Sequence, residues 1–207
     1  MGDDKMKKIA MFALFGAVGF GIGGLFPGPA ALFAFAASFQ RTDWPSAVIA
    51  LAILGFGFAT EGALGGTALG LALGKGRRMT AALALFGGIG FVAGGFLGAS
   101  LCYSFLFFRS GGGMLQVAPP GIALLDGALG GAALGLALRD GRKIIGLALA
   151  GALGFWLGSM IANYVHHWLG FGFLLTVFMF SLQGIIGGAS IGAVMGYLEK
   201  QKAMQNT

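Results

Sequence analysis

Residues 61–74 decide the fold, and they read EGALGGTALGLALG. The same pattern returns at 126–139 as DGALGGAALGLALR, and a more divergent copy stands at 183–196 as QGIIGGASIGAVMG. We name these three stretches the A elements. Self-similar stretches along a chain are typical of proteins built by repeating one structural unit. The sequence therefore predicts three copies of a single unit.

A shorter motif precedes each A element, and we name its three copies the B elements. They read FGAVGF at 15–20, FGGIGF at 86–91 and AGALGF at 150–155. The order along the chain is B, A, B, A, B, A. This alternation predicts three successive helical hairpins that pack with pseudo-threefold symmetry.

The repeats also give the expected domain organisation. We place them at about 7–75, 77–140 and 142–199. Together they form a single transmembrane domain over 1–207, and residues 200–207 form a polar tail.

The bulk composition places this fold in a membrane. Of the 207 residues, 57% are hydrophobic, only 10% are charged, and 41 are glycine. Average proteins carry about 25% charged residues, so a water-soluble domain of this composition could not cover its surface. Apolar stretches of about 20 residues are long enough to cross a bilayer as helices. We therefore predict an all-α integral membrane protein with six transmembrane helices.

The formal net charge of +6 could point to a nucleic-acid partner, but the placement of the basic residues argues against one. Arg41 and Arg109 flank one set of segment ends. The other lysines and arginines flank the alternate ends: Lys5, Lys7, Lys8, Lys75, Arg77, Arg78, Arg139, Arg142, Lys143, Lys200 and Lys202. This asymmetry matches the positive-inside rule. It predicts the lipid bilayer as partner, both termini in the cytoplasm, and a prokaryotic-type inner membrane as the location.

The breaks between apolar stretches give the expected helix ends. The first helix begins near Lys8, and Pro27 and Pro29 either end it or kink it, because proline removes a backbone donor. The later helices are expected from Pro45 to about Gly74, Met79 to Phe108, Pro120 to Arg139, Arg142 to Trp168, and up to Glu199 for the last one.

Glycine recurs at every fourth position of the A elements, which places it in a stripe along one helix face. Lipid tails are as apolar as leucine, so transmembrane helices associate through small residues that let their backbones approach closely. We expect glycine-zipper packing in which A and B stripes face each other. In an alternative arrangement, some stripes face another protein chain. The expected packing residues are Gly62, Gly66, Gly70, Gly127, Gly131, Gly135, Gly184, Gly188 and Gly192.

Glu61 and Asp126 are the sharpest functional signal. Each lies thirteen residues before the expected end of its helix, which is about 20 Å of helix and close to the bilayer midplane. Gln183 stands at the third equivalent place. An acid at that depth costs roughly 2.5–3.5 kcal/mol to insert, and such residues by default mark an ion or proton site.

A structural alternative for these acids stays open, in which both are protonated and hydrogen-bond across helices. Gln183 supports it, because an amide at the third place can make the same contacts without a charge. The available partners are Thr60, Thr67, Ser181 and Asn163.

Other chemistry has weak support in the sequence. His166 and His167 could ligate a metal, a haem or a chlorophyll magnesium, although an interfacial histidine pair is more often solvated. The chain contains neither a CxxCH nor an HExxH motif, and Cys102 lacks the setting of a nucleophile. We therefore expect no enzymatic activity, no catalytic residue and no metal site, and the cofactor stays unknown.

Two functional hypotheses follow from these patterns. The first is a channel or transporter that passes a cation, a proton or a small solute through a site at Glu61, Asp126 and Gln183. The second is a non-catalytic accessory or scaffold subunit of a larger membrane complex, whose partners are other membrane subunits or a second copy of this chain. A cavity that reaches the acids would favour the first hypothesis, and a dry core with paired acids would favour the second.

Overall fold

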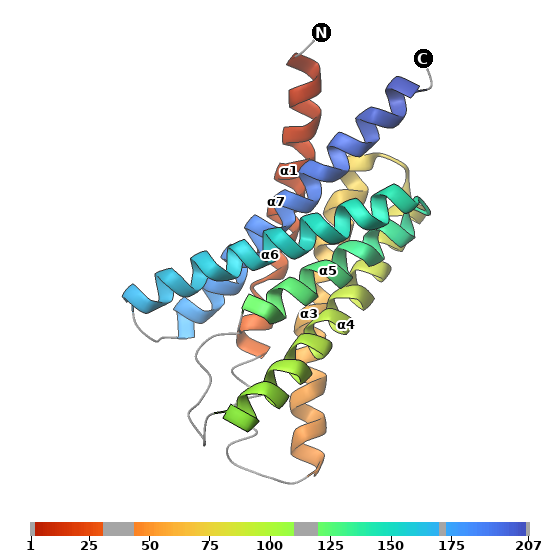
Figure 1. Cartoon of the computed structure of the whole chain (residues 1–207). Coiled ribbons are helices and arrows are strands. Elements are labelled where there is room, and N and C mark those ends of the chain that lie inside the picture. The colour runs from red at the N-terminus through yellow and green to blue at the C-terminus, as the bar shows by residue number, and fades with distance from the viewer. Residues whose placement is uncertain (1–2, 31–43, 110–119, 170–172, 206–207) are drawn as a thin grey trace.

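The computed structural model describes residues 3–30, 44–109, 120–169 and 173–205, and within these ranges it contains helices and turns but no strand. The prediction of an all-helical protein is confirmed. Six long helices follow one another along the chain (Figure 1): α1 (Asp3–Gly23), α3 (Trp44–Leu73), α4 (Arg77–Arg109), α5 (Pro120–Ala137), α6 (Gly141–Leu169) and α7 (Phe173–Gln205).

The apolar stretches in these helices have the length that a bilayer requires. Five of them are long and apolar enough to cross a membrane: Met6–Ala30, Ala52–Leu73, Arg77–Gly98, Gly141–Val165 and Leu174–Lys202. A sixth, Gly121–Ala137, is apolar but shorter. Five to six spanning helices are compatible with the predicted polytopic membrane protein.

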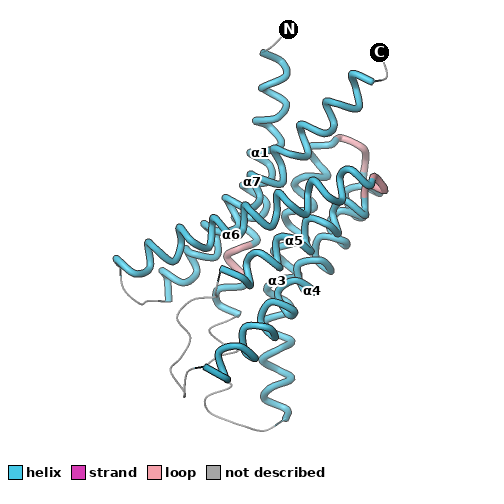
Figure 2. Tube along the Cα trace, viewed as in Figure 1, coloured by secondary structure: helices cyan, strands magenta, loops and turns pink. Residues whose placement is uncertain are grey.

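The helices are arranged as a ring in chain order. Each helix packs mainly on the next one along the chain, and α7 packs back on α1. Both termini and the short α3–α4 and α5–α6 turns lie at one end of the bundle, which is the upper end in Figure 1. We name this the basic end, because Lys75, Arg142 and Lys202 belong to it. At the opposite end, α6 and α7 diverge from α3 and α4 (Figure 2).

The two turns at the basic end are closed by residues with positive φ. Gly74 (φ 63°) ends α3, and Arg139 (φ 51°) ends α5. Glycine adopts this left-handed conformation without strain, whereas a residue with a Cβ atom is strained by about 1–2 kcal/mol. Asp140 caps the start of α6, because its Oδ1 accepts a hydrogen bond from the backbone N–H of Arg142 at 3.2 Å.

The first helix is interrupted just before Pro27. α1 stops at Gly23, and the N–H groups of Leu25 and Phe26 donate to Ile22 and Gly23 in a turn. The chain is helical again over 27–30. Pro27 therefore starts a new helical turn, a position where its missing N–H is tolerated.

Two helix ends differ from the sequence prediction. α1 begins at Asp3 rather than near Lys8, and α7 continues to Gln205 rather than ending near Glu199. The expected polar tail is therefore helical through Gln205, because α7 continues through residues that favour helices. The connections between residue 30 and Trp44, between Arg109 and Pro120, and between Leu169 and Phe173 lie outside the described residues.

Candidate functional site: polar residues in the bundle core

Glu61, Asp126 and Gln183 are buried although their side chains are polar. Their relative exposures are 1%, 1% and 7%, and they lie on α3, α5 and α7. Burial of such groups is costly unless their polar atoms find partners. Their position in the core was expected from the sequence, because charged groups within a spanning segment face the bundle interior.

Each of these residues packs its backbone against a glycine of the preceding helix. A Cβ built on Gly23 would lie 2.6 Å from Cα of Glu61, and one on Gly94 would lie 2.5 Å from Cα of Asp126. On Gly158 it would lie 2.9 Å from Cα of Gln183. Real Cβ atoms do not approach so closely, so only glycine lets α1, α4 and α6 reach the polar residues at this depth.

The structure brings the two acids to the same region of the core. The two carboxyl groups lie near enough for each to influence the other electrostatically. Oε1 of Glu61 also points toward α7, because a Cβ built on Gly184 would lie 3.1 Å from it. Gly184 follows Gln183 directly, so α3, α5 and α7 all contribute to one polar layer, which we name the acid layer.

A cluster of three aromatic rings lies beside the acid layer. The ring centroids of Phe20 and Phe91 are 5.1 Å apart, those of Phe91 and Phe155 are 5.1 Å apart, and those of Phe20 and Phe155 are 5.8 Å apart. All three side chains are fully buried. Each ring sits on a glycine four residues after a member of the acid layer: Gly65, Gly130 and Gly187. Four residues are about 6 Å of helix, so the rings lie one turn closer to the basic end.

Apolar side chains fill the core between the aromatic cluster and the basic end. They are fully or almost fully buried, and they belong to one contiguous core cluster: Phe12, Leu69, Leu83, Leu134, Leu147, Ile191 and Met195. The described core is therefore apolar on the basic-end side of the acid layer.

Three of the four carboxyl oxygens of the acid layer are buried and have no hydrogen-bond partner among the described residues. Oε1 of Glu61 and both Oδ atoms of Asp126 are buried and accept no hydrogen bond there. Unsatisfied buried polar atoms are rare in native structures, and each requires an explanation such as a water, an ion or a functional role. A buried group of this kind costs about 1–3 kcal/mol.

The four side chains that the sequence offers as partners of the acids donate their hydrogen bonds to backbone carbonyls instead. The side chains of Thr60 and Thr67 donate to the carbonyls of Phe56 and Ala63 in their own helix, at 2.8 Å and 2.7 Å. Asn163 donates to the Ser159 carbonyl at 2.8 Å. Ser181 crosses to α1, but it donates to the Gly21 carbonyl at 2.8 Å. Local backbone acceptors compete well for Ser, Thr and Asn side chains inside helices.

The glycines of the A elements lie in the bundle, and each packs on the B helix that follows it around the ring. All nine are buried. A Cβ on Gly66 would overlap the Leu83 carbonyl, and one on Gly131 would overlap the Leu147 carbonyl. The corresponding neighbours of the other seven are Gly87 for Gly62, Thr80 for Gly70, Gly151 for Gly127, Ile144 for Gly135, Phe20 for Gly184, Gly16 for Gly188 and Phe12 for Gly192.

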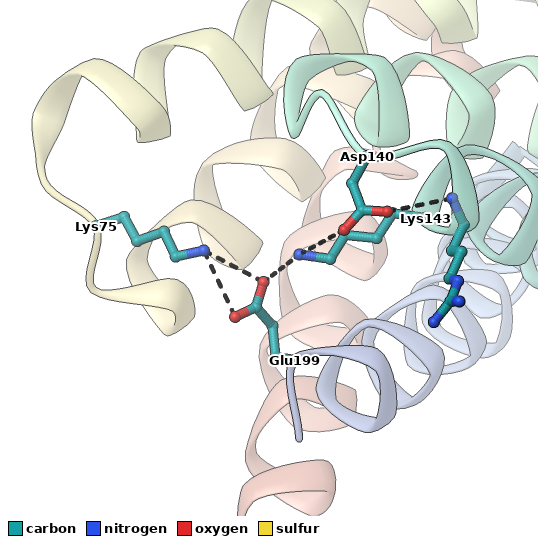
Figure 3. A network of polar contacts seen from close by, with 5 residues as sticks. Lys75, Asp140, Lys143 and Glu199 are labelled. Atoms are coloured by element: carbon teal, nitrogen blue, oxygen red, sulfur yellow. Dashed lines mark hydrogen bonds and ion pairs between the residues drawn. The ribbon is translucent and has the colours of Figure 1, made fainter. Parts of the chain in front are cut away.

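A second polar cluster, which the sequence analysis missed, lies at the basic end (Figure 3). Glu199 pairs with Lys143 through Oε1 and with Lys75 at 3.2 Å, and Lys143 Nζ lies 3.8 Å from Oδ2 of Asp140. The side chain of Lys143 is only 4% exposed. We name these four residues the basic-end network. Its signal in the sequence was that Glu199 and Asp140 are acids in segments otherwise rich in lysine and arginine.

The remaining sequence candidates are His166 and His167. The side chains of His166 and His167 lie outside the described residues. Within the described ranges, no three His, Cys, Asp or Glu side chains gather as metal ligands would. Comparisons of the chain with protein-family models, with curated proteins and with solved structures find no match.

Proposed function

We propose that this protein passes protons or small cations across the membrane through the acid layer of Glu61, Asp126 and Gln183. The observation that carries the proposal is the set of three buried carboxyl oxygens without a partner. If these positions served only to pack helices together, apolar side chains would stabilise the fold more, because they leave no buried polar atom without a hydrogen bond. A proton or a cation supplies the missing partner.

The composition of the acid layer limits the species that it would accept. Two carboxyls and an amide supply oxygen ligands, which suit protons and hard cations rather than soft metals. Ionised carboxylates in the acid layer would repel anions. The proposal therefore concerns a cation or a proton, and no catalysed reaction.

The aromatic cluster acts as a gate in this proposal. Phe20, Phe91 and Phe155 contact one another directly beside the acid layer, and rings of apolar side chains block ions by excluding water. Passage toward the basic end requires these rings to separate. The described conformation corresponds to a closed state.

The finer architecture belongs to the same proposal. We infer three repeated hairpins with pseudo-threefold symmetry and glycine-zipper packing, with the basic end in the cytoplasm of a prokaryotic-type cell. The matching places of Phe20, Phe91 and Phe155 in the three B elements support the symmetry. The gathering of basic residues around the two termini supports the orientation.

A scaffold subunit is the second candidate function, and the filled core favours it. On the basic-end side of the aromatic cluster, the side chains that face the core, such as Leu69, Leu134 and Ile191, are fully buried and belong to the core cluster. Under this alternative, the acids stay protonated and the protein serves other membrane subunits or a second copy of itself.

Flux through proteoliposomes separates the two functions. The test variant combines Glu61→Gln with Asp126→Asn, which keeps shape but removes the ionisable groups. The matched control is Asp140→Asn, the same chemical change at the basic end. We expect a pH gradient to drive flux in the parent and the control, and flux to fall to the level of empty liposomes in the test variant. Equal flux in the parent and the test variant, or none in the parent, would favour the scaffold.

A further inference from the structure

We propose that the cavity between the start of α6 and the end of α7 binds the phosphate-bearing headgroup of an anionic phospholipid. This cavity has a volume of about 390 Å³ and lies at the basic end, away from the acid layer. Arg142, Lys143 and Asp140 line it from α6, and Lys202, Gln201 and Leu198 line it from α7.

The charges that line the cavity do not cancel. Lys143 forms ion pairs with Glu199 and with Asp140, and Asp140 also accepts a hydrogen bond from the backbone N–H of Arg142. Among the described residues, no carboxylate forms an ion pair with the side chains of Arg142 or Lys202. Two cations without a partner therefore face the same cavity.

Asp140 already accepts hydrogen bonds from the N–H groups of Arg142, Lys143 and Ile144 at the start of α6, so the side chains supply the positive potential of the cavity. An Arg side chain offers several donors that match phosphate oxygens, and a Lys side chain adds a point charge. The cavity therefore combines the groups that recognise a phosphate, and Gln201 and Gln205 add amide groups at its rim.

The position of the cavity favours a lipid over a free anion. Basic pockets between transmembrane helices, at the charged ends of those helices, are places where anionic headgroups bind. Leu198 lines the cavity and also packs beside Gly146, where α6 and α7 contact each other. The cavity is therefore continuous with an apolar surface. Ile145, one turn into α6, is 66% exposed, and Tyr197 bonds through its hydroxyl to Gln201 of the lining. Acyl chains would follow this surface while the headgroup occupies the cavity.

The test compares lipid binding by two charge-matched variants of the full chain in detergent. Arg142→Gln with Lys202→Gln removes the two unpaired cations of the cavity. Lys8→Gln with Arg78→Gln removes two exposed cations that do not line it. Native mass spectrometry measures binding of dioctanoyl phosphatidylglycerol, with dioctanoyl phosphatidylcholine and inorganic phosphate as comparison probes.

We expect the parent to bind phosphatidylglycerol in preference to phosphatidylcholine, and the cavity variant to bind it about thirtyfold more weakly, since each cation near an anionic headgroup contributes about fivefold. The control variant should stay within about twofold of the parent. Three results would overturn the proposal: no preference for phosphatidylglycerol, an equal loss in both variants, or binding of inorganic phosphate as tight as that of the lipid, which would mark a site for free anions.

Discussion

The acid layer and the basic-end network both contain carboxyl groups, but these groups differ in whether they have partners. In the network, the Glu199 carboxylate has two lysines within ion-pair distance, and even the nearly buried Lys143 has an acid on either side. In the acid layer, Asp126 has no hydrogen-bond partner for either oxygen among the described residues. A fold that satisfies its carboxyls in one place and not in another assigns them different roles. In the function proposed above, the network holds helices together and the acid layer binds a proton or a cation.

The largest expected effect concerns the packing that encloses the acid layer. Gly94→Leu should destabilise the protein by about 3 kcal/mol or more, because its side chain would enter the backbone of Asp126. Loss of a monodisperse species on size-exclusion chromatography and a lowered thermal midpoint in detergent would report it.

The matched control is Gly121→Leu, since nothing lies within 4 Å of a Cβ built on Gly121. If both variants melted at the parent temperature, α4 would not approach α5 closely at Asp126. The described packing of Gly94 against the acid layer would then be wrong.

The next largest effect tests the basic-end network. Lys143→Met should cost about 3 kcal/mol, because removal of one partner leaves the Glu199 carboxylate poorly compensated in a buried place. Lys75→Met should cost under about 1 kcal/mol, since the Lys75 side chain is exposed and its pair is screened by water. Chemical unfolding in mixed detergent micelles would measure both.

A combined variant, Lys143→Met with Glu199→Leu, sharpens this test. It removes both charges, so stability should return toward that of the parent. A double variant as unstable as Lys143→Met would mean that shape, and not charge, makes Lys143 important.

The smallest effect on stability is expected in the acid layer itself. Glu61→Gln with Asp126→Asn should change the free energy of unfolding by about 1 kcal/mol at most, because no described hydrogen bond of the unpartnered oxygens is lost and a charge is removed from the core. The same unfolding experiment measures it. A loss as large as that of Lys143→Met would make the acids structural, and the comparison between the two regions would fail.

Much of the fold could be predicted from local patterns. The apolar runs gave the helices, and the depth of Glu61 and Asp126 in those runs placed them in the core. The break at Pro27 was recognised, but its outcome depended on the turn formed by Gly23 and Phe26. The end of α7 was missed, although Lys202 and Gln205 belong to a stretch of residues that favour helices.

Contacts between distant segments could not be predicted. Lys143 and Glu199 are 56 positions apart, and Lys75 and Glu199 are 124 apart. Nothing local indicates that such side chains meet, because the meeting depends on the order of helices around the ring. Thr60 and Asn163, which the sequence offered as available partners of the acids, donate to backbone carbonyls instead. Each had a backbone carbonyl within its own helix, which local geometry favours over a distant acid.

The contact between α7 and α1 has a consequence for biosynthesis. Chains are made from the N-terminus, so α1 enters the membrane long before its neighbour exists. One surface of α1 carries Phe12 and Gly16, and Gly192 and Gly188 of α7 pack on it in the folded protein. This surface is exposed to lipid until α7 has been inserted. Closure of the ring is therefore the final event of assembly. A chain truncated before α7 would leave the packing surfaces of α1 and α6 permanently exposed to lipid. The membrane insertion machinery or a quality-control protease would recognise these surfaces as those of an incompletely folded protein.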